Sequence, residues 1–330
     1  VRGTVRSLKN TEKVKHLYNL CPDAKHKLEL VEADLTDDDS WPRAVAGCEY
    51  IHHVASPFPM DEPKNEAKVI EPAVQGTLSV LKAAAKSGTV KRVVVTSSSL
   101  AVCCVGGNTE PKTENDWTDL SDPATSAYPK SKHLAEKAAW DFVKDLPDDE
   151  KFELATINPV LILGPVLQGQ AGTSLNIIKQ LLMREVPVVP HFNIGVCDVR
   201  DCAEAHLRCM TLPEAVGNRH IIFHSTMWVR EAAEVLRAEF ASQGYHPPSI
   251  PLPNWVVWLA SWFSSTLATR YRTITQPLPF DNSRMKNVLK IEPTPPQKSL
   301  IDMAYSLIEG GHVPKTAQYK GPPAPEVSQL

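Results

Sequence analysis

Signals for disulfides, metal clusters and membrane spans are missing from this chain of 330 residues. Its seven cysteines are an odd number and contain no Cys-x-x-Cys pair, which favours a reducing compartment over a disulfide framework. Their spacing does not match that of zinc ligands, so we expect no metal site. No apolar run reaches the roughly 20 residues that a membrane-spanning helix needs. These absences predict a cytoplasmic protein without membrane contact.

A large excess of charge of one sign is also lacking. The 35 Lys and Arg residues nearly balance the 38 Asp and Glu residues, and no basic stripe runs along any segment. A nucleic-acid partner is therefore not expected, because such partners require clustered positive charge. A small-molecule substrate remains the most economical interpretation.

What the chain does contain is a regular alternation of apolar strand patterns with helical patterns. Helices are predicted between these strands, with the longest two at 65–86 and 128–144. This order predicts an α/β protein with a Rossmann-type doubly wound parallel sheet, whose ligands lie beyond the carboxyl ends of the strands. The predicted strands cover residues 1–6, 27–33, 50–54, 92–96 and 153–157, with Asn158-Pro159 breaking the last. The residues at their carboxyl ends are Arg6, Asp34, Ala55, Ser98 and Pro159.

The pattern becomes looser and richer in proline after residue 160. We predict an NADP-binding domain over residues 1–160 and a smaller, mainly substrate-binding region over residues 161–313. Some elements of this second region are expected to return to the first domain. Residues 314–330 are predicted to form a flexible tail.

A hydroxyl, a phenol and an ammonium meet in one predicted site. Lys132 follows Tyr128 by four residues, so both lie on one face of a predicted helix. Ser98 belongs to the serine triplet that ends the strand before it, although Ser97 and Ser99 offer the same chemistry. A cation beside a phenol stabilises the phenolate, and a serine hydroxyl can hold a substrate oxygen. The set is suited to interconverting an alcohol and a carbonyl.

The order of these motifs resembles the extended short-chain dehydrogenases/reductases. Within that NAD-dependent epimerase/dehydratase group, the chain looks most like the dihydroflavonol reductase-like branch. The matching segments are Ala33-Asp34-Leu35, His53-Val54-Ala55-Ser56-Pro57, Val95-Thr96-Ser97-Ser98, Tyr128-Pro129-Lys130-Ser131-Lys132, Asn158-Pro159 and Gly164-Pro165. The resemblance implies catalysis by Ser98, Tyr128 and Lys132.

The resemblance also implies a cofactor site. An acidic residue at the end of the family's second strand favours NAD, whereas this chain has Arg6 there and Lys13 close behind. Positive charge suits a 2′-phosphate, so NADP(H) is the expected cofactor. The resemblance places the remaining contacts at Asp34 and Leu35 near the adenine, and at Ala55, Ser56, Tyr128, Lys132, Pro159 and Ser174 near the nicotinamide half.

Members of this family begin with a strand and a glycine-rich phosphate loop that this chain lacks. We therefore expect about 30 residues, one βα unit, to be missing before Val1. In this topology the first strand lies in the middle of the sheet, so its loss is expected to destabilise the chain and to weaken cofactor binding.

The predicted function is the NADPH-dependent reduction of an aldehyde or ketone, with Tyr128 as proton donor. Alternatives are a 3β-hydroxysteroid dehydrogenase, a nucleotide-sugar epimerase or dehydratase, a non-catalytic NADP sensor, and an inactive truncated product. Dihydroflavonol reductases carry Asn or Asp where this chain has Cys103, which disfavours a polyphenolic substrate. The chain is expected to be a monomer or a homodimer.

Overall fold

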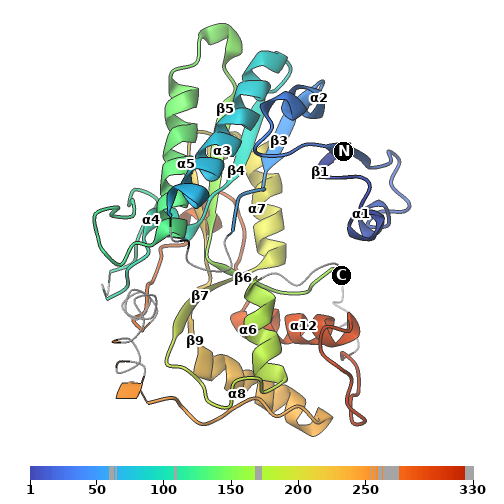
Figure 1. Cartoon of the computed structure of the whole chain (residues 1–330), viewed down its shortest axis with the longest axis vertical. Coiled ribbons are helices and arrows are strands. Elements are labelled where there is room, and N and C mark those ends of the chain that lie inside the picture. The colour runs from blue at the N-terminus through green and yellow to red at the C-terminus, as the bar shows by residue number, and fades with distance from the viewer. Residues whose placement is uncertain are drawn as a thin grey trace.

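The molecule has two lobes, an α/β lobe and a smaller lobe below it (Figure 1). The computed structural model describes residues 1–58, 63, 65–107, 110–167, 173–253, 255–256, 258, 262 and 275–323, without the side chains of residues 12, 13 and 173. In these ranges no helix is long and apolar enough to cross a membrane.

The centre of the larger lobe is a four-stranded sheet in which every neighbouring pair is parallel. Its order is β3 (Tyr50–His53), β4 (Arg92–Thr96), β5 (Glu153–Pro159) and β8 (Arg219–Ile222). Helices α3 (Ala67–Ser87) and α5 (Ala127–Lys144) pack side by side on one face, and α7 (Val199–Thr211) covers the other (Figure 1). This part confirms the predicted parallel sheet with helices on both faces, and β8 is a returning element from the second half of the chain.

Local sequence signals explain where the elements of this lobe begin and end. Helix α3 stops at Gly88, which adopts φ 63° and donates its N–H to the Ala85 carbonyl. Glycine tolerates this left-handed conformation without a Cβ clash. Strand β4 is almost continuously buried, which explains its uninterrupted run of valines. Strand β5 runs through Pro159, whose register partner is Ile222, so the predicted break at Asn158-Pro159 is wrong by two residues.

The parallel strands of the larger lobe fall into two groups in the structure. Strands β1 (Arg2–Val5) and β2 (Glu29–Glu32) form a separate parallel pair, accompanied by α1 (Thr11–Tyr18). Strands β1 and β3, which the family topology places on either side of its first strand, share no ladder of main-chain hydrogen bonds among the described residues. Arg2 of β1 connects this pair of strands to the rest of the lobe, because its guanidinium donates to the carbonyls of Ala44 and Ala46.

These two carbonyls end helix α2, which precedes β3 and follows a short 3₁₀ turn. Helix α2 covers Trp41–Val45 and the turn covers Asp38–Ser40. Trp41 and Val45 pack with Val31 and Val80 in a small core that joins β2 to α3. Side-chain packing, and not sheet hydrogen bonding, therefore holds the β1–β2 pair on the larger lobe.

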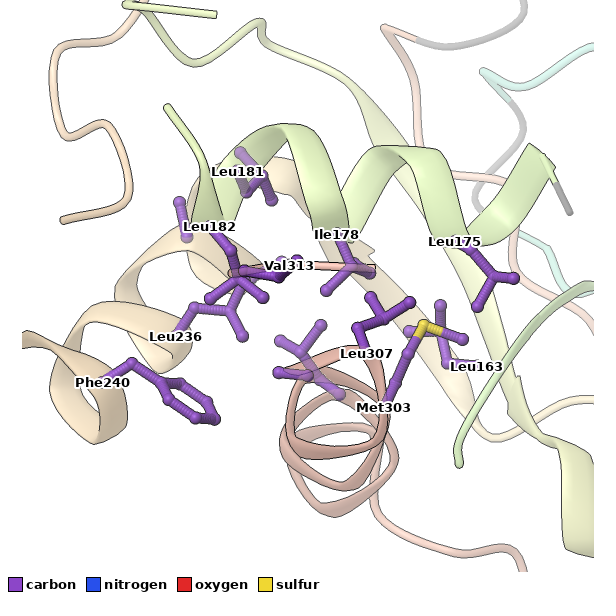
Figure 2. Packing of buried hydrophobic residues seen from close by; sticks show 14 of the residues in the cluster. Leu163, Leu175, Ile178, Leu181, Leu182, Leu236, Phe240, Met303, Leu307 and Val313 are labelled. Atoms are coloured by element: carbon purple, nitrogen blue, oxygen red, sulfur yellow. The ribbon is translucent and has the colours of Figure 1, made fainter. Parts of the chain in front are cut away.

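The smaller lobe contains its own sheet and its own apolar core. Strands β6 (Leu161–Leu163) and β7 (Asn193–Asp198) are parallel, and β9 (Ser225–Trp228) is antiparallel to β7. Its helices are α6 (Thr173–Leu182), α8 (Val229–Phe240) and α12 (Pro296–Glu309). Side chains from α6, α8 and α12 converge in Figure 2, including Ile178, Leu236 and Leu307, each fully buried. Burial of each such side chain contributes about 1.5–3 kcal/mol.

Shorter elements complete the described part of the chain. They are α4 (Ser99–Val102), α11 (Ser283–Asn287) and the 3₁₀ turns Asp148–Glu150, Pro213–Ala215 and Ala241–Gln243. Near the carboxyl end, the ring of Tyr319 contacts those of Tyr245 and Tyr305, and Lys320 N donates to the Gln243 side chain. Tyr319 and Lys320 of the predicted tail thus contact the smaller lobe, whereas residues 324–330 lie outside the described part.

Candidate active site

Tyr128 and Lys132 lie in the first two turns of α5, where the spacing of four residues brings them together. The Lys132 ammonium is 5.8 Å from the centroid of the Tyr128 ring. Helix α5 begins after Ser126, so both side chains are at the end of the helix that lies near the carboxyl end of β4. Lys132 is buried, and the ring of Phe58 packs edge-on against Tyr128 at a centroid distance of 4.7 Å.

A small pocket extends from Lys132 toward the carboxyl ends of β3 and β4. Besides Lys132, its wall contains two further predicted cofactor residues, Ala55 and Ser56. The complete lining is His53, Ala55, Ser56, Thr77, Val95, Thr96, Ser97, Lys132, Ala135 and Glu136. The structure thus brings Lys132 together with the loop after β3 and with Ser97 after β4, whereas Ser98 and Tyr128 do not line this pocket.

Burial controls the protonation of the pair in the protein alone. It raises the pKa of Tyr128 to about 12. Burial also lowers the pKa of Lys132 to about 8, against the effect of the Glu136 carboxylate, which raises it. Lys132 was expected to lower the pKa of Tyr128, but in the protein alone that pKa is raised, because the phenol is removed from water. Tyr128 is a protonated phenol, ready to donate.

The three serines at the end of β4 have different partners. Ser97 Oγ donates to a carboxylate oxygen of Glu136 at 2.6 Å. Ser98 caps α4, and its Oγ accepts from Leu100 N at 3.1 Å. Acceptance by Oγ leaves the Ser98 hydroxyl hydrogen unused in that bond. The geometry therefore distinguishes Ser98 from Ser97, which the sequence could not do.

Arg6 and Asp34 lie together at the carboxyl ends of β1 and β2. Bonds from the Thr36 side chain and amide lower the pKa of Asp34, and the charge of Arg6 contributes to the same shift. Arg6 itself is exposed. Leu35 lies against α3 so closely that a Cβ on Gly76 would be 2.9 Å from its side chain. The side chain of Lys13 lies outside the described residues.

Pro159 and Ser174 take up positions on two other elements. Pro159 is buried as the last residue of β5, and Ser174 is half-buried in the first turn of α6. Neither lines the pocket around Lys132, so their assignment to the cofactor stays a prediction.

Glu136, which follows Lys132 by one further helical turn, was not among the predicted site residues. Its side chain is fully buried and forms an ion pair with Arg219, Nε to Oε1 at 2.6 Å. A signal was present in the sequence. Thr156 and Asn158 alternate along an otherwise apolar strand, which places two polar side chains on the same side of β5. Both bind Glu136.

This parallel sheet, with helices on both faces and a Tyr–Lys pair beside the carboxyl ends of its strands, defines a Rossmann-like protein of the extended short-chain dehydrogenase/reductase class. Residues 3–223 match the NAD dependent epimerase/dehydratase family model. The chain belongs to that family.

Curated relatives include plant reductases of one branch. The chain is 36% identical over 259 residues to cinnamoyl-CoA reductase CAD2 of Medicago truncatula, covering 77% of this chain and 75% of the relative. It is 35% identical to cinnamoyl-CoA reductase 1 of Petunia hybrida, covering 98% and 89% respectively. It is also 35% identical to anthocyanidin reductase of Arabidopsis thaliana, with 72% of each chain covered. The resemblance to the dihydroflavonol reductase-like branch is confirmed. The expected absence of a βα unit gains no support from these alignments.

Solved structures show the same fold. The yeast methylglyoxal/isovaleraldehyde reductase Gre2 complexed with NADPH superposes with a TM-score of 0.75 at 25% identity, covering 95% of this chain and 92% of that one. Vestitone reductase of alfalfa superposes with a TM-score of 0.69 at 24% identity, covering 95% and 91%. These similarities extend over both lobes, including the smaller one that the sequence pattern described only loosely.

Proposed function

We propose that the protein reduces the carbonyl group of an aldehyde or ketone to an alcohol, with NADPH as the hydride source. The observation that carries the proposal is the Tyr128–Lys132 pair, in which the half-buried Tyr128 lies beside the buried Lys132 and Lys132 lines a pocket at the carboxyl ends of β3 and β4. Two kinds of similarity support it. The plant relatives are named as reductases, and the yeast reductase of similar fold was solved with NADPH.

The residues of this site suit a nicotinamide cofactor. The carboxylate of Glu136 is taken up by Ser97, Asn158, Thr156 and Arg219, so the nearby Lys132 ammonium keeps its donors for another oxygen. A ribose hydroxyl in the pocket would meet that need. At the far end, the exposed Arg6 guanidinium offers bidentate donors to a 2′-phosphate. The preference for NADP(H) over NAD rests on Arg6.

Three side chains have distinct roles in the proposed chemistry. The bound cofactor supplies the hydride. Tyr128 donates its phenolic proton to the carbonyl oxygen as that oxygen gains negative charge, and its raised pKa keeps the proton in place beforehand. Ser98 donates its hydroxyl hydrogen to the same oxygen and holds it. Lys132 stabilises the phenolate that remains on Tyr128, because its ammonium lies beside that ring.

Substitution of the proton donor tests the proposal. Tyr128→Phe should reduce NADPH-dependent turnover by at least about 100-fold, which is the contribution of a positioned general acid. The assay is NADPH oxidation with a panel of aldehydes, ketones, cinnamoyl-CoA, dihydroflavonols and 3-ketosteroids, which also separates the alternative substrate classes. Binding of NADPH, followed by its fluorescence, should change little in the variant.

Tyr50→Phe is the matched control, because Tyr50 is 45% exposed at the start of β3, away from the pocket. It removes the same hydroxyl and should leave turnover unchanged. Near-normal turnover by Tyr128→Phe would exclude Tyr128 as the proton donor. NADPH binding without turnover of any carbonyl by the parent protein would support a non-catalytic cofactor-binding role.

A further inference from the structure

A buried carboxylate that the proposed chemistry does not use lies one turn beyond Lys132. The Glu136 side chain has no exposed surface. Taking an ionised carboxylate out of water is costly unless it is paired and hydrogen-bonded. The donors that compensate the buried charge of Glu136 therefore identify the elements that this carboxylate connects.

Donors to Glu136 come from three neighbouring strands or their ends. Ser97 after β4 and Asn158 of β5 donate to Oε2 at 2.6 and 2.7 Å. Thr156 of β5 donates to Oε1 at 3.0 Å, and Arg219 of β8 donates to Oε1 through Nε at 2.6 Å and to Oε2 through Nη2 at 3.3 Å. One carboxylate thus joins α5 to three neighbouring strands of the main sheet.

Asn158 extends this network to the serine assigned to the substrate oxygen. Its Nδ2 donates both to Glu136 Oε2 and to the main-chain carbonyl of Ser98 at 3.2 Å. Ser97, which precedes Ser98 in the chain, donates directly to Glu136. The position of the Ser98 hydroxyl relative to α5, which carries Tyr128, is therefore fixed through Glu136.

Arg219 connects the same carboxylate to the segment between α4 and α5. Its Nη1 donates to the carbonyls of Glu114 and Asp116 at 2.9 and 2.6 Å. Its guanidinium lies 3.7 Å from the centroid of the Trp117 ring. Arg219 is 8% exposed, so it balances the buried charge of Glu136 and holds this segment in place.

Lys132 has few other charges around it. In the described lining of its pocket, β3 contributes His53, α5 contributes Glu136, and α3 and β4 contribute only uncharged side chains. Burial, together with the charge of Lys132, lowers the pKa of His53 to about 4, so this imidazole is neutral near neutral pH. Tyr128 is a protonated phenol. Glu136 is then the anion in this group that favours the ammonium form of Lys132.

We propose that Glu136 is a positioning residue of the reductase site: through its bonds to Ser97 and Asn158 it sets the place of Ser98 beside α5, and through its charge it keeps Lys132 protonated. This inference rests on the proposed function for its effect on turnover. Its effect on Lys132 is a property of the protein alone and can be measured without substrate or cofactor.

The direct test is a titration of Lys132 in the full chain, followed by the NMR signal of its ¹³C-labelled ε-carbon and identified by its absence in Lys132→Met. In Glu136→Gln the midpoint should move to lower pH, because the compensating negative charge is lost. Asp198→Asn is the matched control. Asp198 is an equally buried carboxylate paired with an arginine, but it lies in the other lobe, and its removal should leave the Lys132 midpoint unchanged.

Loss of Glu136 leaves Arg219 buried without its anion, which can prevent folding. Glu136→Gln/Arg219→Met removes both charges and restores a neutral, apolar neighbour of similar size. The Lys132 midpoint should move in the same direction in this double variant. An unchanged midpoint in either variant, once circular dichroism has shown that it is folded, would overturn the inference.

Turnover supplies the second readout. The alkaline limb of the kcat/KM profile should move to lower pH in Glu136→Gln, and kcat/KM at the parent's optimum should fall by up to about 100-fold, as expected for a misplaced catalytic group. The two proposals fail separately. Absence of carbonyl reduction by the parent would defeat the proposed function alone, whereas an active parent with an unchanged Lys132 titration in the variants would defeat the role of Glu136 alone.

Discussion

Two buried carboxylates, Glu136 in the larger lobe and Asp198 in the smaller, have similar partners but stabilise different parts of the molecule. Both side chains have no exposed surface, and both pair with an arginine. The partner of Glu136 is 8% exposed, whereas Arg200, the partner of Asp198, is 43% exposed and also binds Asp302. The first pair is closed off from water, and the second is half open to it.

The reach of the two carboxylates also differs. Asp198 caps its own helix by accepting from Arg200 N at 2.8 Å, and it accepts from Ser299 Oγ of α12 at 2.6 Å. Its bonds are mostly local in sequence. The bond to Ser299 spans 101 positions, but the other bonds named for Asp198 are to Arg200, two residues away. The donors to Glu136 lie on three different strands or their ends, 20 to 83 positions away. The comparison shows that a buried charge can serve either one helix terminus or the assembly of several strands around a catalytic pair.

Among the variants that test this comparison, Arg219→Met is expected to have the largest effect on the free energy of unfolding. The substitution leaves Glu136 buried without its cation and should cost about 3–5 kcal/mol of unfolding free energy. Urea unfolding measures the loss. The double variant Glu136→Gln/Arg219→Met should recover much of it, because no uncompensated charge remains. A cost below about 1 kcal/mol for Arg219→Met would mean that the pair is not closed off from water.

Asp198→Asn should have a smaller effect, about 1–2 kcal/mol, because Arg200 keeps water and Asp302 as partners while the helix loses a charged cap. Burial by itself would raise the pKa of Asp198, but the bonds from Arg200 and Ser299 outweigh it and hold that pKa below its ordinary value.

The pH dependence of this difference follows from the sign of the shift. A lowered pKa in the folded state stabilises the protein above the ordinary carboxyl range, and this stabilisation is lost as the pH falls through the folded pKa. The gap between parent and Asp198→Asn in urea unfolding should therefore be full at neutral pH and close in acid. A gap that persists unchanged at acid pH would contradict the ionised state of Asp198.

The smallest effect is expected at the surface of α5. Lys137 pairs with Asp141 one turn later, and both side chains are about half exposed, at 52% and 55%. Exposed pairs of this kind contribute less than about 0.5 kcal/mol. Lys137→Ala should therefore leave the urea midpoint and turnover nearly unchanged. A large loss would show that charge on α5 matters well beyond Glu136.

Elements whose boundaries depend on nearby residues were predicted correctly. Strand β4 was predicted with its observed bounds and α5 within one residue, because a run of valines and a helical repeat are complete within a few turns. The left-handed end of α3 at Gly88 is equally local. Catalytic candidates at strand ends followed from the same alternation, and the structure gathers Ala55, Ser56 and Lys132 around one pocket.

Features that depend on distant partners were missed. The sequence does not reveal that β7 pairs with β9 in the antiparallel sense, since that pairing leaves no local repeat. Glu136 was overlooked for the same reason. In the sequence it is one acid among many on a helix, and only the fold brings Arg219 and Asn158 to it.

The division between β1 and β3 has a consequence for motion. Arg6 and Asp34 lie at the ends of the β1–β2 pair, whereas Lys132 lies against the four-stranded sheet. Because no ladder of main-chain bonds joins these two sheets in the described residues, the first can separate from the second without breaking strand pairing within either. The opening free energy of the outer pair is therefore set by the small core around Trp41 and Val31 and by the bonds of Arg2. The two ends of the proposed cofactor site are thus carried by parts of the molecule with separate local stabilities.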